Sequence, residues 1–253
     1  MSLAIRDNLW EGVYENFAEA DGDLDAFSTD IWVSKQKDRI YAALDDLNQG
    51  SFVSKDYPLP LVISMLLCEK DHISVIDFGG GMGLQYLEMI AKVPMAKDKV
   101  GYSVVDEISS IQHRPPELNQ FNMLKFFSNF NDIEESNLDI IHMGSTLQYI
   151  EDWKGLLQTL NKKFKPKYFV FSDILAGNVP SFVTRQIFYE KKIPVNILNI
   201  EEFKDYMRTQ FFCINYQTLF QNIILGNTIL PNSLLPEKNR LSMASNLIFK
   251  RSE

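Results

Sequence analysis

The sequence is poor in the residues that build small, cross-linked or fibrous proteins. Its 253 residues include only two cysteines, Cys68 and Cys213, which lie far apart and outside any C-x-x-C spacing. This excludes a disulfide framework and a zinc knuckle, and it predicts a reducing, cytoplasmic location. Glycine and proline number only 12 and 10, which excludes a collagen-like or wholly disordered chain.

Positive charge and long apolar runs are also scarce. The chain has 25 Lys and Arg against 33 Asp and Glu, a net charge of −8, which argues against nucleic acid as a partner. The longest apolar run, residues 59–68, is broken by Pro60 and Ser64, and the first residues lack the pattern of a secretion signal. We therefore expect no membrane insertion and a small-molecule partner. Composition leaves the oligomeric state open.

The first part of the chain has a helical pattern. Trp10, Tyr14 and Phe17 are spaced i, i+4 and i+7, which predicts an amphipathic helix. Similar patterns predict helices over 34–48 and 59–69. We therefore expect residues 1–70 to form an N-terminal helical cap.

The first 30 residues carry eight acidic side chains and one basic side chain, Arg6. Such a run is typical of a solvated surface, with a docking surface for a cationic partner as the alternative.

From residue 71 the pattern alternates between strand and helix. Ile73–Phe78 is a β-branched run that ends in a glycine cluster, and helical spacing resumes over 84–93. Further strands are predicted over 100–105, 124–128, 138–143 and 168–172, with a helix over 153–164. This alternation predicts a Rossmann-like, doubly wound and mostly parallel sheet within a domain of residues 71–253.

The last third of the chain is less regular. Helices are predicted over Ser181–Glu190 and Glu201–Thr209, separated by a break at 191–194. Residues 211–217 and 243–250 read as two antiparallel edge strands, which complete a seven-stranded sheet.

The strongest functional signal is the D-x-G-x-G-x-G run that begins at Asp77. It lies between a predicted strand and a predicted helix. Positive φ is accessible to Gly79, Gly81 and Gly83, and these residues have no Cβ that would obstruct a ligand. Gly80 makes the loop more flexible. The start of the following helix offers free N–H donors. The run predicts a cofactor loop, although a turn that only connects strand to helix is the alternative.

Comparison of motifs narrows the choice of cofactor. Leu84 stands where a dinucleotide fingerprint needs Gly or Ala, and the Gly-Lys-Ser/Thr ending of a P-loop is absent. A carboxylate at Asp77 would repel a pyrophosphate and suits a cationic ligand. S-adenosylmethionine carries a sulfonium and an ammonium group and no phosphate, so it fits these residues.

A second anchor is predicted at Asp106, which ends the next strand 23 positions after Gly83. A carboxylate there can accept hydrogen bonds from both ribose hydroxyls of an adenosine. Glu107 is the adjacent substitute, and a turn-capping carboxylate is the alternative role for Asp106.

Together these residues resemble the class I S-adenosylmethionine-dependent methyltransferases over about residues 70–175. The segment Ile140–Asp152 is similar to the family's fourth-strand segment. The resemblance implies that Asn129 and Phe130 flank the adenine and that Gly144 and Ser145 approach the methionine part of the cofactor.

A narrower resemblance concerns residues 10–14 and 145–149. Both are similar to bacterial methyltransferases associated with surface-polysaccharide gene clusters. This implies a sugar-related acceptor.

Methyl transfer needs an acceptor held in line with the donor and shielded from water. A hydroxyl acceptor is helped by a base, and the candidates at or beyond strand ends are Asp173, His142, Tyr149 and Tyr189. Asp173 is preferred, because His142 lies within a strand and is typical of a hydrogen-bonded structural histidine.

The sequence predicts no metal site, and it leaves two other functions open. The remaining histidines, His72 and His113, lack ligand spacing, so no metal site is predicted. A nicotinamide-dependent oxidoreductase and a non-catalytic S-adenosylmethionine-binding module would both share the predicted fold.

Overall fold

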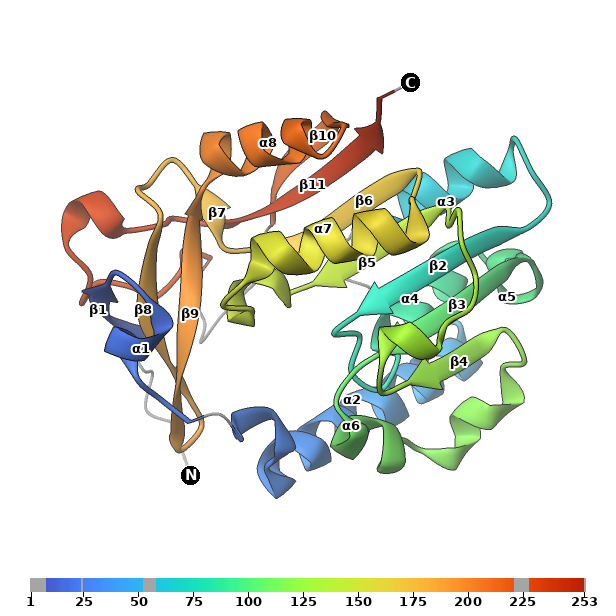
Figure 1. The fold of residues 1–253 in the computed structure, drawn as a ribbon. Coiled ribbons are helices and arrows are strands. Elements are labelled where there is room, and N and C mark those ends of the chain that lie inside the picture. The colour runs from blue at the N-terminus through green and yellow to red at the C-terminus, as the bar shows by residue number, and fades with distance from the viewer. Residues whose placement is uncertain (1–7, 24, 52–57, 221–227, 253) are drawn as a thin grey trace.

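The protein contains two β-sheets, shown in Figure 1 in a computed structural model that describes residues 8–23, 25–51, 58–220 and 228–252. The large sheet has the order β10-β11-β6-β5-β2-β3-β4 and the small sheet the order β1-β8-β9-β7. The strands of the large sheet are β2 (Ile73–Phe78), β3 (Val100–Val105), β4 (Leu124–Phe127), β5 (Ile140–Gly144), β6 (Tyr168–Ile174), β10 (Phe212–Phe220) and β11 (Ala244–Arg251). Those of the small sheet are β1 (Trp10–Tyr14), β7 (Ala176–Gly177), β8 (Phe182–Phe188) and β9 (Lys191–Asn199).

In the described part of the chain, three α-helices precede the first strand of the large sheet and the other five lie between its strands. They are α1 (Phe17–Ala20), α2 (Asp30–Gln49), α3 (Leu59–Leu67), α4 (Leu84–Lys92), α5 (Ala96–Lys99), α6 (Ile108–Gln112), α7 (Trp153–Phe164) and α8 (Ile200–Thr209). None of these helices is both long enough and apolar enough to span a bilayer, a finding that applies to the described residues.

The large sheet confirms the predicted doubly wound architecture. Strands β2 to β6 run parallel, and β11 and β10 close one edge in the antiparallel sense. The strand order reverses at β2, which pairs with β3 on one side and with β5 on the other. In such sheets a crevice opens outside the carboxyl ends of the strands at this reversal point.

Each face of the large sheet has its own hydrophobic core. On one face, α2, α3 and α4 pack onto the strands through side chains such as Ile40, Ile63 and Leu87. On the other face, α7 and α8 pack through side chains such as Leu160 and Phe203. Burial on both sides explains why the central strands read as nearly continuous apolar runs.

Helix α2 shows how local sequence sets its ends and its orientation. The Thr29 hydroxyl accepts the Trp32 N–H at the start, and Gly50 ends the helix with a left-handed φ of 67°. Its buried face runs through Val33, Gln36, Ile40 and Ala43, at helical spacing.

The predicted helix through residues 10–17 is wrong. Trp10–Tyr14 is β1, which pairs antiparallel with β8 and carries a bulge between Glu11 and Tyr14. Gly12 lies in that bulge with a φ of 77°, a conformation outside any right-handed helix. The i, i+4, i+7 spacing of the aromatic residues is compatible with a helix, but antiparallel pairing with the distant strand β8 makes this segment a strand.

The predicted helix over Ser181–Glu190 and the break at 191–194 are also wrong. Strands β8 and β9 form an antiparallel hairpin in which Phe188 pairs with Lys191. Its two-residue turn contains Tyr189 at a φ of 55°, without the Asn-Gly or Asp-Gly signal that normally marks such turns. Val183, Thr184 and Ile187 are β-branched residues that favour the strand.

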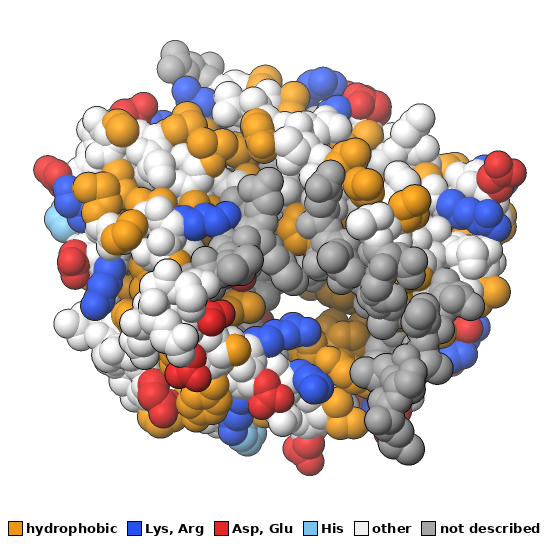
Figure 2. All heavy atoms as spheres, turned by 180° about the vertical axis from the view of Figure 1, so that it is seen from behind, with side chains coloured by type: hydrophobic (Ala, Val, Ile, Leu, Met, Phe, Trp, Pro, Cys, Tyr) orange, Lys and Arg blue, Asp and Glu red, His pale blue; other side chains and the backbone are white. Residues whose placement is uncertain are grey.

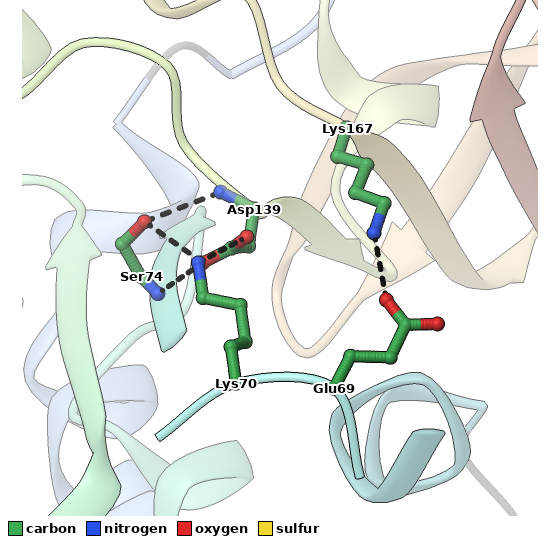
Figure 3. Close-up of polar contacts among 5 residues, drawn as sticks. All are labelled: Glu69, Lys70, Ser74, Asp139 and Lys167. Atoms are coloured by element: carbon green, nitrogen blue, oxygen red, sulfur yellow. Dashed lines mark hydrogen bonds and ion pairs between the residues drawn. The ribbon is translucent and has the colours of Figure 1, made fainter. Parts of the chain in front are cut away.

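A partly buried polar cluster ties the amino ends of β2 and β5 together, at the end of the sheet opposite the carboxyl ends of these strands (Figure 3). Asp139 is 6% exposed and accepts hydrogen bonds from Lys70 Nζ at 2.7 and 2.8 Å and from the Ser74 N–H at 2.9 Å. The Asp139 N–H in turn donates to Ser74 Oγ at 3.2 Å. A neighbouring ion pair joins Lys167 to Glu69 at 3.0 Å.

Replacing Asp139 by alanine should destabilise the fold by about 2 kcal/mol, because it leaves the Ser74 N–H without its buried acceptor. Urea unfolding measures the change. The matched control is Asp71→Ala, whose ion pair with Lys99 lies at the surface with the aspartate side chain 89% exposed. We expect the control to behave as wild type, and equal effects of the two substitutions would contradict the assignment.

Candidate functional site

The structure brings most of the predicted cofactor residues together at the carboxyl ends of the parallel strands of the large sheet, here called the carboxyl edge. The glycine loop follows β2, Asp106 follows β3, Asn129 lies beyond β4, and Ser145 follows β5. The strands are parallel, so their carboxyl ends meet there, as Figure 1 shows. Asp173, near the end of β6, lies at the same edge.

The glycine loop is more closely packed than the sequence analysis anticipated. Gly79, Gly81 and Gly83 have φ values of 73°, 59° and 87°, as expected. A Cβ at Gly79 would overlap the Thr146 side chain, and one at Gly81 would overlap Gln36 Oε1. The space that sequence reasoning assigned to a ligand is therefore filled at these two points by the chain's own side chains.

Asp106 is held against this loop by backbone donors. Its Oδ2 accepts the Gly81 N–H at 2.7 Å and its Oδ1 accepts the Glu107 N–H at 2.8 Å. Burial raises the pKa of Asp106, and these two bonds together with one from Ser110 oppose that rise. A carboxylate has about four acceptor positions, so with these three in use about one remains for a ligand hydroxyl. The Glu107 side chain itself is exposed.

Asp77, by contrast, faces the protein interior. Its side chain is 0% exposed; Oδ2 accepts the Tyr102 O–H at 2.9 Å and Oδ1 lies 2.7 Å from His142 Nδ1. Burial and the nearby carboxylate raise the pKa of Tyr102, so the phenol stays protonated and donates. The expected direct contact of Asp77 with a cationic ligand does not fit this burial.

His142 continues the same buried chain. Its Nε2 lies 3.0 Å from Ser172 Oγ, and the residue is 0% exposed. This is the hydrogen-bonded structural histidine that the sequence analysis favoured, and its burial separates it from an acceptor.

A strained pair lies at the ends of β5 and β6. Ser145 and Asp173 have left-handed φ values of 51° and 53°, and the Ser145 hydroxyl donates to Asp173 Oδ2. Left-handed backbone at non-glycine residues is costly and concentrates at functional sites. Thr146 Oγ1 lies 2.9 Å from the Gly144 carbonyl oxygen and 3.3 Å from that of Gly79. Asp173 is thus linked to the glycine loop through a short run of contacts.

The other predicted residues have local roles. Asn129 accepts the Asn131 N–H with its side chain, and Phe130 packs with its ring centroid 6.2 Å from that of Phe78. The Tyr149 O–H donates to Gln186 Oε1 at 2.9 Å, and burial raises the pKa of Tyr149, so the phenol is not a base at neutral pH.

A cluster of rings, here named the aromatic wall, joins the N-terminal segment to the small sheet. Its members are Phe27, Trp32, Tyr149, Phe188 and Tyr189. The Phe27 centroid lies 4.9 Å from that of Tyr149 and 5.3 Å from that of Phe188. Figure 2 shows the molecule from behind, with an opening bordered partly by hydrophobic side chains.

Sequence reasoning missed Gln36, Thr146, Ser110 and Gln148. Gln36 and Ser110 reach the edge from α2 and α6 through long-range contacts, for which the sequence holds no local signal. Thr146 and Gln148, whose Nε2 donates to the Asp173 carbonyl oxygen at 3.4 Å, lie in the segment that follows β5, within the Ile140–Asp152 motif described above. Across the described part of the chain, no three His, Cys, Asp or Glu side chains gather in a way that could hold a metal ion.

Comparison with protein families identifies the chain at this point. A family model described as a methyltransferase domain matches residues 54–211, more than half of the chain. The chain belongs to the methyltransferase domain family. A search among curated proteins gives no match.

Solved structures share this methyltransferase's fold at low sequence identity. One is 1,6-didemethyltoxoflavin-N1-methyltransferase from Burkholderia thailandensis, solved with bound 1,6-didemethyltoxoflavin and S-adenosylhomocysteine. Its sequence is 12% identical to this chain, and the TM-score is 0.52. The alignment covers 86% of this chain and 91% of that protein. Another is an S-adenosylmethionine-dependent methyltransferase from Clostridium acetobutylicum, at 11% identity and a TM-score of 0.51, with 85% and 99% covered. Family and fold together confirm the prediction of a methyltransferase with a Rossmann-like fold.

The loop geometry makes a prediction about Gly81. Gly81→Ala should destabilise the methyltransferase by more than Gly50→Ala, because both residues have positive φ but only the Cβ at position 81 meets another group, Gln36 Oε1. Gly50→Ala should cost about 1 kcal/mol for the left-handed backbone alone. Urea unfolding of both variants measures the difference, and equal losses would show that the contact with Gln36 is not tight.

Proposed function

We propose that this methyltransferase transfers a methyl group from S-adenosylmethionine to a hydroxyl of a small, sugar-related acceptor, with Asp173 accepting the hydroxyl proton. The observation that carries the proposal is the strained Ser145–Asp173 pair, which lies at the carboxyl edge and is linked through Thr146 to the glycine loop. The pair puts a carboxylate close to the place where the cofactor is expected.

The residues at this edge suit the cofactor. Asp106 retains about one acceptor position for a ribose hydroxyl, and its bond from the Gly81 N–H holds it against the glycine loop. We assign the cofactor site to a set of residues around that loop: Gly79, Gly80, Gly81, Gly83, Asp106, Asn129, Phe130, Gly144 and Ser145. Asp77 supports the loop from within, and Glu107 contributes its backbone N–H.

The chemistry divides between cofactor and protein. The bound sulfonium supplies a methyl carbon that an oxygen lone pair can attack in line, with the electrons of the carbon–sulfur bond going to sulfur. The protein holds the acceptor hydroxyl and takes its proton at the Asp173 carboxylate, which the Ser145 hydroxyl orients. Tyr149 stays protonated and offers hydrogen bonding and ring surface only.

Two features support a sugar-related acceptor. The aromatic wall offers flat apolar rings, and the Gln186 amide beside it adds polar groups that could meet hydroxyls. The resemblance of residues 10–14 and 145–149 to methyltransferases of surface-polysaccharide gene clusters agrees with this choice. We also propose a cytoplasmic location, which the two exposed free cysteines support.

Calorimetry with S-adenosylhomocysteine tests the cofactor site. Asp106→Ala should weaken binding by about 10- to 100-fold, because hydrogen bonds to a charged acceptor are lost. Glu107→Gln is the control, since the Glu107 side chain is exposed, and it should bind as wild type does. Burial raises the pKa of Asp106, so affinity should fall on acidification at a higher pH than for an ordinary aspartate.

Thermal unfolding in the presence of each cofactor distinguishes the methyltransferase from a nicotinamide-dependent oxidoreductase. Thermal stabilisation by NAD and none by S-adenosylhomocysteine would indicate the oxidoreductase. Binding that is unchanged in Asp106→Ala would show that the site is misplaced.

Asp173→Asn tests the catalytic step. Across a panel of hydroxylated acceptors that includes sugars, it should lower turnover by about 100-fold while leaving the affinity for S-adenosylhomocysteine within about twofold of wild type. The Asn side chain keeps an oxygen for Ser145 but is a far weaker base. Formation of S-adenosylhomocysteine measures turnover, and Asp152→Asn, at the start of α7, serves as the surface control. Absence of turnover in wild type with every acceptor would favour the non-catalytic binding module.

A further inference from the structure

Gln36 is a polar side chain on the buried face of α2. It is 7% exposed and lies between Val33 and Ile40 on that face. A buried amide is costly unless both of its ends have partners. Gln36 finds its partners at the cofactor edge rather than within its own helix.

The amide bridges two separate segments of that edge. Gln36 Oε1 accepts the Met82 N–H of the glycine loop at 3.2 Å. Gln36 Nε2 donates to Ser110 Oγ on α6 at 3.2 Å. Ser110 is 0% exposed, so this contact is shielded from water.

These contacts close a ring of hydrogen bonds. Ser110 also hydrogen bonds to the Asp106 carboxylate, and Asp106 Oδ2 accepts the Gly81 N–H at 2.7 Å. Gly81 is covalently joined to Met82, where the ring returns to Gln36. The ring therefore contains both predicted cofactor anchors, the glycine loop and Asp106, and α2 completes it.

We propose that Gln36 is a positioning residue for the cofactor, setting the separation between the glycine loop and Asp106 before the cofactor binds. This inference rests on the cofactor site proposed above. Without the amide, the Met82 N–H loses its partner, and the loop stays linked to the Asp106 segment by the Gly79 N–H bond to the Val105 carbonyl at 2.8 Å and the Gly81 N–H bond to Asp106. The cofactor would then have to order the loop itself, which lowers affinity.

The opposite role would give the opposite result. Gln36 Oε1 fills the space beside Gly81, so an amide that competed with the cofactor would weaken binding in wild type. Its removal would then tighten binding, whereas a positioning role predicts weaker binding on removal.

Gln36→Leu tests the inference, because leucine occupies a similar volume without hydrogen-bonding groups. Calorimetry should show a dissociation constant for S-adenosylhomocysteine that is about tenfold higher than in wild type. In turnover assays KM for S-adenosylmethionine should rise, while kcat at saturating cofactor stays within about twofold of wild type, because Gln36 does not touch the reacting atoms.

Ile40→Val is the matched control. It removes one methylene from the same buried face of α2, one turn along, and should lower stability without changing cofactor affinity. Hydrogen exchange on the cofactor-free proteins adds a second measurement. The amides of residues 79–86 should exchange faster in Gln36→Leu than in wild type or in Ile40→Val.

If Gln36→Leu does not fold, the same calorimetric measurement is made on Ser110→Ala. This substitution breaks the ring at its next member and should weaken binding similarly. The double variant should show less than the sum of the two effects.

The outcomes are distinguishable. Unchanged or tighter binding in Gln36→Leu or Ser110→Ala, with normal binding in wild type, would overturn the positioning role. Failure of wild type itself to bind would instead overturn the proposed cofactor site, and the exchange measurement would still report on the ring.

Discussion

The hydrogen bond from the Gly81 N–H to Asp106 Oδ2, at 2.7 Å, joins the first two strand-and-helix units of the large sheet at their carboxyl ends. The bond needs the left-handed φ of Gly81, because the loop must turn sharply to aim this N–H at the next strand. The contact holds the loop after β2 next to the residue after β3 at the point of strand reversal, which is where ligands bind in sheets of this kind.

Behind the loop, four buried polar side chains are hydrogen bonded to one another. One hydrogen-bonded chain crosses the neighbouring strands β3, β2, β5 and β6. It runs through Tyr102, Asp77, His142 and Ser172, in that order. In a low-dielectric interior such a chain is rigid when each member is satisfied. In front of it, Ser145 and Asp173 have strained backbone and are only partly buried. The site thus combines a fixed support with a front edge that can meet ligands.

The small sheet encloses this edge and brings new residues to it. Strand β8 carries Gln186 and Phe188 toward the segment after β5, where Tyr149 meets both Gln186 and Phe27. The family match shows a methyltransferase domain, and the solved structures share its fold. The family model covers Tyr149, Phe188 and Tyr189 of the aromatic wall, whereas Phe27 and Trp32 precede the matched residues 54–211.

Local patterns predicted the repeating part of the fold well. The strand at 100–105 and the helix at 153–164 match β3 and α7 at both ends, because their apolar periodicity and their end signals agree. The errors came where a strand is stabilised by a distant partner. Trp10–Tyr14 and Phe182–Phe188 pair with each other across some 170 residues, and a short aromatic segment without turn signals is compatible with either helix or strand.

The sequence by itself determined the order of the strand-and-helix units, the glycine loop and the carboxylate at Asp106, because hydrophobic period and backbone freedom are properties of neighbouring residues. Only the tertiary structure decided that Asp77 faces inward, that Gln36 reaches the loop from α2, and that Ser145 meets Asp173. These relations depend on packing between segments far apart in the chain, where burial and hydrogen-bond pairing, rather than local preference, select the arrangement.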